Sequence, residues 1–232
     1  MKIALVGYGK MGKIIDEISQ KRGHNIVARL SETPTLENLN NPDVVIEFSN
    51  PEVAFDNIKT CLENKIPVIC GTTGWLDQKP EIDRIAVENE TAFLYGSNFS
   101  LGVNLFFALN ENLAKMMNRF PEYNCQLEEI HHIHKLDAPS GTAISLAEGV
   151  ISNSKFEAWK LDETIDKELG IFAIREDEVP GTHSVFYRSE VDEIEIKHTA
   201  FNRNGFALGA VIAAEWIVGK KGVFSMKDVL GL

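Results

Sequence analysis

The chain has 232 residues, a formal net charge of −11, 44% hydrophobic residues and 25% charged residues. A chain of this length can bury the core of one large domain or of two modest ones. The excess of acidic residues excludes a dominant basic surface, so we expect neither nucleic acid nor an anionic membrane as a partner. The three cysteines, Cys61, Cys70 and Cys125, show no Cys-x-x-Cys spacing, which disfavours a disulfide framework and a zinc ribbon.

The N-terminal apolar run is interrupted at Gly7, before it reaches the length of a signal peptide. No later window reaches the roughly 20 apolar residues that a membrane-spanning helix needs. We therefore expect a cytoplasmic protein whose cysteines are reduced and buried.

A glycine-rich turn follows the first predicted strand, at residues 2–6, and leads into an amphipathic segment. A Gly-x-Gly-x-x-Gly pattern between a strand and a helix is typical of a dinucleotide site, because the backbone can approach a pyrophosphate at the positive end of the helix. The alternative is a turn that only packs the strand on the helix. The candidate cofactor residues of this turn are Gly7, Gly9, Lys10, Met11 and Gly12.

Strands and helices alternate through the first hundred residues, which predicts a parallel, doubly wound sheet of the α/β Rossmann type. We expect strands at 2–6, 25–30, 43–48, 66–70 and 91–95, and helices over about 14–22, 52–63 and 78–89. Ligands of such sheets bind at the carboxyl ends of the strands. Further cofactor candidates therefore follow the later strands: Phe48, Gly71, Thr72, Thr73, Gly96, Ser97, Asn98 and Phe99.

The residues after the second strand leave the choice between NADH and NADPH open. An acidic residue is expected there to bind the ribose hydroxyls of NAD, and either Ser31 or Glu32 stands at that position. Arg29 would meet a 2′-phosphate if its side chain pointed that way.

The second half of the chain has a different pattern. A long apolar helix is predicted at 103–117, a strand at 125–130, a helix at 142–150, and strands at 171–174, 183–186 and 194–198. Because no helix separates the last two strands, we expect an α+β domain built on a mainly antiparallel sheet. Residues 162–168 form a mixed-charge run that we interpret as solvated, and 207–218 is predicted to be a buried helix that packs on the first domain.

The stretch EIHHIHKLDAPSGTA at 129–143 concentrates the residues that can carry chemistry. It has no histidine spacing of the HExxH type and no cysteine, so we expect no metal site. His131 and Lys135 are four residues apart and suit proton transfer near neutral pH. Ser140, Gly141 and Thr142 stand at a predicted helix start, where they would either bind a carboxylate or phosphate or only cap the helix.

This stretch resembles the pattern E-x-H-H-x-x-K-x-D-A-P-S-G-T-A of the dihydrodipicolinate reductase family, the 4-hydroxy-tetrahydrodipicolinate reductases of diaminopimelate and lysine biosynthesis. Further matches in the same order include GTTG at 71–74, SNFSLGVN at 97–104, HTAFNR at 198–203 and the final FSMKDVLGL. The resemblance covers nearly the whole chain.

The resemblance implies a Rossmann domain of residues 1–99 with 203–232, and a substrate-binding and oligomerisation domain of residues 100–202, with hinges near Phe99 and Arg203. It implies reduction of a small cyclic dicarboxylate by NADPH or NADH. By matching position, His131 is a proton donor or acceptor, Lys135 donates a proton to the ring nitrogen, and His132, Gly141 and Thr142 hold the carboxylate.

Two departures from the family pattern bear on assembly and cofactor. A hairpin that the family carries between Val185 and Glu193 is expected to be deleted, so that either a dimer or a tetramer is possible. Ser31 replaces the usual acid, with Glu32 beside it, and this predicts dual use of NADPH and NADH. Two other functions stay open, namely another nicotinamide-dependent reductase and a nucleotide-sensing module without turnover.

Overall fold

The computed structural model describes residues 1–202 and 204–232. The chain divides into two compact units, Met1–Leu101 with Asn204–Leu232, and Gly102–Arg203. Arg203, where the second hinge was expected, lies outside the described residues. In the part of the chain that is described, no helix is both long enough and apolar enough to cross a membrane.

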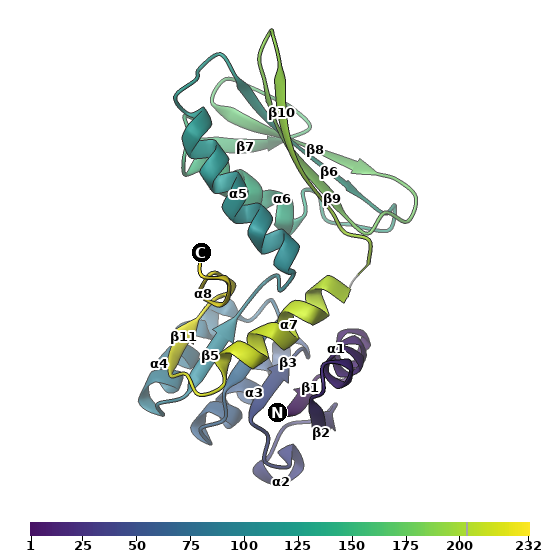
Figure 1. The fold of residues 1–232 in the computed structure, drawn as a ribbon, viewed down its shortest axis with the longest axis vertical. Coiled ribbons are helices and arrows are strands. Elements are labelled where there is room, and N and C mark those ends of the chain that lie inside the picture. The colour runs from purple at the N-terminus through teal and green to yellow at the C-terminus, as the bar shows by residue number, and fades with distance from the viewer. Residues whose placement is uncertain (203) are drawn as a thin grey trace. The chain divides into compact units, whose positions relative to one another are not determined.

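The first unit is built on one parallel sheet (Figure 1). Its strand order is β11-β5-β4-β3-β1-β2. The strands are β1 (Lys2–Val6), β2 (Asn25–Leu30), β3 (Val44–Glu47), β4 (Val68–Cys70), β5 (Ala92–Tyr95) and β11 (Gly222–Phe224). The chain passes from β1 outward to β2 and then back to β3 on the other side of β1, so the topological switch point lies between β1 and β3, where ligands of such sheets bind.

Helices cover both faces of this sheet, which confirms the doubly wound prediction. The helices are α1 (Lys10–Lys21) and α7 (Asn204–Ile217) on one face, α3 (Pro51–Glu63) and α4 (Lys79–Glu88) on the other, with the short α2 (Leu36–Leu39), η1 (Leu76–Gln78) and α8 (Met226–Leu230). We did not predict α2, α8 or β11. These elements have three to five residues, too few to show a hydrophobic period.

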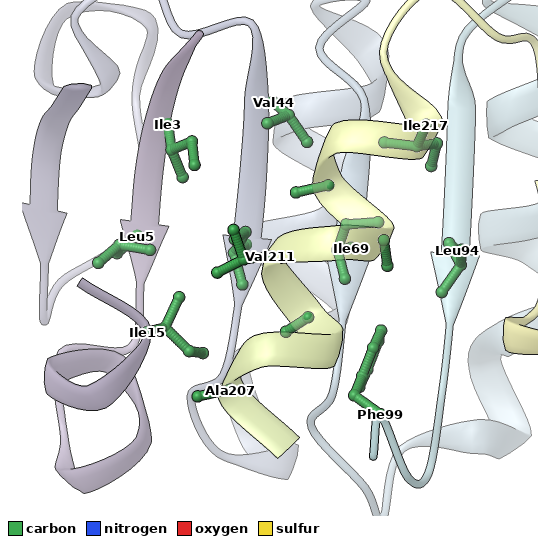
Figure 2. Packing of buried hydrophobic residues seen from close by; sticks show 14 of the residues in the cluster. Ile3, Leu5, Ile15, Val44, Ile69, Leu94, Phe99, Ala207, Val211 and Ile217 are labelled. Carbon is green, nitrogen blue, oxygen red and sulfur yellow. The ribbon is translucent and has the colours of Figure 1, made fainter. Parts of the chain in front are cut away.

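Helix α7 returns the C-terminal part of the chain to the first unit, as expected. Figure 2 shows Ala207, Val211 and Ile217 of α7 packed against side chains that point from the sheet towards this helix, among them Ile69 and Leu94. All five side chains are fully buried. This apolar contact on α7 therefore supplies much of the core on that face of the sheet.

The second unit has a five-stranded sheet in the order β10-β9-β6-β8-β7, with two helices on one face. The elements are α5 (Leu101–Met117), β6 (Asn124–His131), α6 (Gly141–Ile151), β7 (Ala158–Leu161), β8 (Glu168–Arg175), β9 (Thr182–Arg188) and β10 (Glu193–Thr199). Residues 162–167 of the mixed-charge run form the exposed connection between β7 and β8, as expected, and Glu168 begins β8.

The second sheet is mixed, which corrects the expectation of a mainly antiparallel one. β6 pairs with β8 in parallel and β8 with β7 in parallel, while β9 pairs antiparallel with both β6 and β10. Helix α6 carries the chain from the end of β6 back along the sheet, so the following strand runs in the same direction as β6. The sequence pattern did not reveal β7, and without β7 this crossover could not be recognised.

The segment between Val185 and Glu193 is the closed end of a hairpin rather than the place of a lost one. β9 and β10 pair antiparallel over their full length, from Arg188 opposite Glu193 to Thr182 opposite Thr199. The Gly-x-His sequence that was expected after Val185 stands just before it, as Gly181-Thr182-His183. The hairpin was expected to be missing because the Gly-x-His motif was sought after Val185, whereas it lies before Val185 in this chain.

Candidate functional site

The glycine turn after β1 is shaped by two close approaches. Gly7 has a φ of +94°, and a Cβ on it would lie 2.1 Å from the carbonyl oxygen of Phe48. A Cβ on Gly12 would lie 2.3 Å from the carbonyl oxygen of Gly7. The loops after β1 and β3 touch at the switch point, and α1 begins directly against them. Because a side chain would collide with backbone at both positions, only glycine fits there. Gly9, with nothing within 4 Å of its Cβ position, leaves the start of α1 open to a ligand.

The later strand ends divide into ligand-accessible and structural side chains. Thr73 and Ser97 are exposed, whereas Thr72 and Phe99 are buried. The Thr72 hydroxyl accepts a hydrogen bond of 2.9 Å from the backbone N–H of Ser49, and the Phe99 ring belongs to the core of the first unit. Thr72 and Phe99 therefore stabilise this edge of the sheet, and a ligand would meet their backbone.

A buried acid that the sequence analysis missed lies at the same edge. Glu47, the last residue of β3, is fully buried. Its carboxylate accepts hydrogen bonds from the backbone N–H and the hydroxyl of Ser49, and from the Cys70 thiol at 3.2 Å. Burial and the nearby carboxylate hold the pKa of Cys70 well above its usual range, so this thiol stays protonated. Glu47 was overlooked because it continues an otherwise apolar strand.

Near the carboxyl end of β2, Arg29 takes part in an ionic network with α1. Arg29 Nε donates to Asp16 Oδ2 at 2.6 Å, and the Tyr8 hydroxyl donates to the same oxygen at 2.6 Å. Asp16, on α1, is 5% exposed. Burial raises the pKa of Asp16, but the hydrogen bonds from Arg29, Tyr8 and Gln20 outweigh burial and lower it.

This network binds Arg29 to α1, while Ser31 and Glu32 remain exposed after β2. In this structure Arg29 is paired with Asp16 rather than free for a 2′-phosphate, with 40% of its side chain exposed. Asp16 was not among the predicted site residues, and its partner Arg29, 13 residues away, gave no local signal.

In the second unit, the opening residues of the histidine motif meet a strand from later in the chain. Glu129 and His131 are two apart on β6 and so share one face of the strand. His183 on β9 stands directly opposite Glu129 in the antiparallel ladder, and β6 and β9 lie side by side in Figure 1. All three side chains are buried.

The Glu129 carboxylate is the anionic centre of this group. It is fully buried, accepts the backbone N–H of Ser140 at 3.1 Å on each oxygen, and pairs with the Arg175 guanidinium at 3.1 Å. Burial raises the pKa of Glu129, but hydrogen bonds from His183 and Ser140 outweigh burial and lower it to about 2, with a smaller contribution from His131, which is protonated at that acid pH. Glu129 is therefore ionised at neutral pH.

The His131 ring lies between Glu129 and His183. Its Nδ1 is 3.5 Å from Glu129 Oε2, and its ring centroid is 5.0 Å from that of His183 in an edge-on arrangement. Burial lowers the pKa of His131 to about 4, and Glu129 opposes this shift while His183, Lys135 and Arg175 reinforce it. His131 is therefore uncharged at neutral pH.

Lys135 and His132 belong to the loop that follows β6. The Lys135 ammonium donates to both oxygens of Asp137, at 2.9 and 2.8 Å, and this hydrogen bond lowers the pKa of Asp137. Because β6 ends at His131, the backbone from there to Lys135 is neither regular strand nor helix. The four-residue spacing of His131 and Lys135 therefore does not by itself place the two side chains on the same side of the backbone.

Ser140, Gly141 and Thr142 lie at the start of α6, as expected. The Ser140 hydroxyl accepts the N–H of Ala143 at 3.2 Å and lies 3.2 Å from His183 Nε2. Ser140 therefore caps the helix and also joins the buried group on β6 and β9. Gly141 has open space at its Cβ position, which leaves the first turn of α6 accessible to an anion.

Ligand atoms of Glu129, His131 and His183 all lie within 4.8 Å of one another, a spacing that can hold a metal ion. The expectation of no metal site rested on the contiguous motif, and His183 comes from another strand. Arg175 binds the same carboxylate, and its positive charge disfavours a dication at this position. The absence of a metal remains a prediction.

Sequence comparison matches both units. The profile of dihydrodipicolinate reductase, N-terminus, matches residues 1–99, and that of dihydrodipicolinate reductase, C-terminus, matches residues 102–230. The 4-hydroxy-tetrahydrodipicolinate reductase of Christiangramia forsetii is 54% identical over 99% of this chain and 98% of the relative. This coverage leaves no room for a whole deleted hairpin relative to that protein.

More distant relatives agree with this match. The 4-hydroxy-tetrahydrodipicolinate reductase of Methanocaldococcus jannaschii is 34% identical over 98% of this chain and 81% of the relative. The solved structure of a dipicolinate-bound dihydrodipicolinate reductase from Paenisporosarcina sp. TG-14 has a TM-score of 0.78, with 21% identity over 97% of each chain. The structural likeness shows that the two proteins share a fold.

Proposed function

The chain belongs to the dihydrodipicolinate reductase family, and we propose that it reduces 4-hydroxy-tetrahydrodipicolinate to tetrahydrodipicolinate with loss of water, in diaminopimelate and lysine biosynthesis. The observation that carries this proposal is the 54% identity to a named reductase over nearly the full length of both chains. In the overall reaction one hydride and one proton enter, and one water leaves.

The first unit fits a nicotinamide dinucleotide. The turn of Gly7, Gly9 and Gly12 presents the start of α1 at the switch point, where a Cβ would collide with backbone at the first and last of these positions. Lys10 and Met11 line the same turn, and the exposed Thr73 and Ser97 stand at neighbouring strand ends. When bound, the nicotinamide supplies the hydride for C4 of the substrate ring.

In the second unit, we assign proton transfer to His131 and Lys135. Lys135 is the donor to the ring nitrogen, since its ammonium group is half-buried beside Asp137 in the loop that follows β6. His132 and the first turn of α6, with Ser140, Gly141 and Thr142, would hold a substrate carboxylate. Support for this comes from the open first turn of α6, whose backbone N–H groups attract an anion.

We further propose that the enzyme uses both NADH and NADPH. Arg29 is neutralised by Asp16, and Glu32 follows Ser31 at the exposed end of β2, so no free cation there favours a 2′-phosphate among the described residues. A preference of about 100-fold or more for either cofactor, a free-energy difference of roughly 2.7 kcal/mol, would refute dual use.

Assembly and compartment are also proposals. The face of the second sheet opposite α5 and α6 includes Phe172 and Ile174, and we propose that it builds a homodimer or homotetramer. The three cysteines are free and buried, which suits the reducing cytoplasm.

Two other functions compete with this proposal. A different nicotinamide-dependent reductase would share the first unit only, whereas the matched relatives cover both units. A nucleotide-sensing module would bind cofactor without turnover and would tolerate a His131→Ala/Lys135→Ala double substitution.

The deciding experiment follows NADPH and NADH absorbance while a synthase generates the substrate from pyruvate and aspartate semialdehyde. Wild type is compared with Lys135→Ala, which should lower kcat by about 10²- to 10⁴-fold and leave the cofactor Kd unchanged. A wild-type protein that binds cofactor but turns over neither would favour the sensing module.

A further inference from the structure

The imidazole of His131 is enclosed by residues from three strands and the loops beside them. Glu129 lies on the same strand, His183 on β9 and Arg175 at the end of β8. Gly181, just before β9, has a φ of +155°, and a Cβ on it would come within 3.0 Å of His131 Nε2. An alanine at this position would therefore press on the ring itself.

The two nitrogens of the His131 ring have different surroundings. Of the four side chains that act most strongly on the His131 pKa, Glu129 is the anion, and it opposes Arg175, Lys135 and the neighbouring His183. The Glu129 carboxylate lies 3.5 Å from Nδ1, an ion-pair distance at which this buried nitrogen makes no hydrogen bond. In an uncharged imidazole one nitrogen carries the proton and the other a lone pair, and the carboxylate favours the proton on Nδ1.

The contacts of Glu129 explain how it keeps its place. Both of its oxygens accept the Ser140 backbone N–H, and Oε1 also pairs with Arg175. His183 closes the other side, since its Nε2 lies 3.6 Å from Glu129 Oε2 and 3.2 Å from the Ser140 hydroxyl. A carboxylate held by these donors has little freedom to turn away from the His131 ring.

We infer that Glu129, Gly181 and His183 are positioning residues for His131, which hold its ring with the proton on Nδ1 and the lone pair of Nε2 free. With the proton on Nδ1, His131 can take up a proton only at Nε2, and Lys135 remains the donor of the one proton that enters the product. This inference rests on the proposed function for its catalytic meaning, but the state of the ring can be measured without turnover. A metal ion on the same three side chains is the competing arrangement.

The first test is NMR of the full-length protein labelled with ¹⁵N-histidine, with His131 assigned from a His131→Asn variant. Long-range ¹H–¹⁵N couplings distinguish the two tautomers and the charged ring. We expect His131 to be uncharged from pH 8 to pH 5, with its proton on Nδ1. A ring protonated on Nε2, or one that becomes charged near pH 6.5, would overturn the inference.

The second test removes one positioning group at a time. Glu129→Gln keeps the shape but not the charge, and its matched control is Glu128→Gln, the neighbouring acid on the other face of β6. We expect Glu129→Gln to mix the His131 tautomers and to lower kcat by about 10- to 100-fold, with the KM for cofactor unchanged. The Glu128 variant should keep the wild-type tautomer.

Gly181→Ala provides an independent route if Glu129→Gln fails to fold. Its control is Gly219→Ala, which also introduces a side chain at a positive φ but has nothing within 4 Å of the Cβ. We expect Gly181→Ala alone to shift the His131 resonances and to lower kcat by about 10-fold. Unchanged resonances in Gly181→Ala would contradict a role of Gly181 in seating the ring.

Failure of this inference and failure of the proposed function are separable. If wild type shows no turnover while the tautomer responds as expected, the function is wrong and the geometry stands. If wild type turns over but its tautomer is the other one, only the positioning role is wrong. Addition of zinc that shifts His131 and His183 together at equimolar ratio, an effect lost in His183→Asn, would establish the metal arrangement instead.

Discussion

At the scale of single residues, the second unit contains a buried acid and a buried uncharged base that share a contact. Glu129 has a pKa of about 2 and His131 a pKa of about 4 in the fold. Each value lies below the ordinary one for its residue type, so at acid pH the unfolded chain binds protons that the folded chain does not. Folding is therefore linked to pH through these two side chains.

This linkage predicts that the free energy of unfolding falls as the solution is acidified. The ordinary pKa of histidine is 6.5, and that of folded His131 is about 4, so His131 lowers the free energy of unfolding as the pH falls from 6.5 towards 4. The stabilisation by Glu129 is complete above 4.5 and is lost as the pH falls towards about 2. Urea unfolding at pH 7, 5 and 3.5 should show progressive loss in wild type.

Glu129→Gln should have a lower stability at pH 7 and a shallower decline below pH 4.5, because the amide does not titrate. Glu128→Gln serves as the control on the same strand. Parallel stability curves for wild type and Glu129→Gln below pH 4.5 would show that Glu129 is not the linked group.

At the scale of elements, the network of Asp16 with Arg29 and Tyr8 ties three pieces of the first unit together. Asp16 lies on α1, Arg29 on β2 and Tyr8 in the glycine turn. Two donors share one carboxylate oxygen at 2.6 Å. The network therefore holds the glycine turn through Tyr8. It also pairs the guanidinium of Arg29, near the end of β2, with a carboxylate.

Asp16→Asn should release Arg29 and shift cofactor choice towards NADPH. Without the carboxylate, the guanidinium becomes available to a 2′-phosphate, an ion pair that we expect to favour NADPH by about 10-fold over wild type, or roughly 1.4 kcal/mol. Fluorescence titration with NADH and NADPH measures the ratio of Kd values. Glu17→Gln, an exposed acid on the same helix, should leave the ratio unchanged, and an unchanged ratio in Asp16→Asn would contradict the prediction.

The packing of α7 on the loop after β5 depends on a glycine. A Cβ on Gly209 would lie 1.7 Å from the carbonyl oxygen of Phe99, so the helix must move if a side chain is added. Gly209→Ala should destabilise the protein by about 1–3 kcal/mol, although alanine favours helices intrinsically. Chemical unfolding measures the loss, and a stabilised variant would show that the helix and loop do not meet this closely.

At the scale of the whole molecule, helices α5 and α6 of the second unit cover one face of its sheet, and no other helix described within that unit covers the opposite face. Side chains of Phe106, Leu146 and Val185 fill the covered side. On the other face Ile174 is 39% exposed, beside Phe172 on the same strand. An open sheet face with apolar side chains is typical of a surface that another subunit covers.

Light scattering should therefore give the mass of a dimer or tetramer. Ile174→Asp should weaken the assembly towards monomer, because a charge would have to be buried in the interface. Val87→Asp introduces the same charge at an exposed position on α4 and should leave the mass unchanged. A monomeric wild type would show that this face is not a subunit interface.

The sequence by itself determined the Rossmann-type sheet, the buried α7 and the residues of the histidine motif. These features depend on local signals: the period of apolar residues, glycines beside a strand end, and a contiguous pattern shared with a family. Only the tertiary structure decided the mixed order of the second sheet, the pairing of Arg29 with Asp16, and the meeting of Glu129 with His183. Such contacts join residues far apart in sequence, and each element's own pattern is the same whichever strand becomes its neighbour.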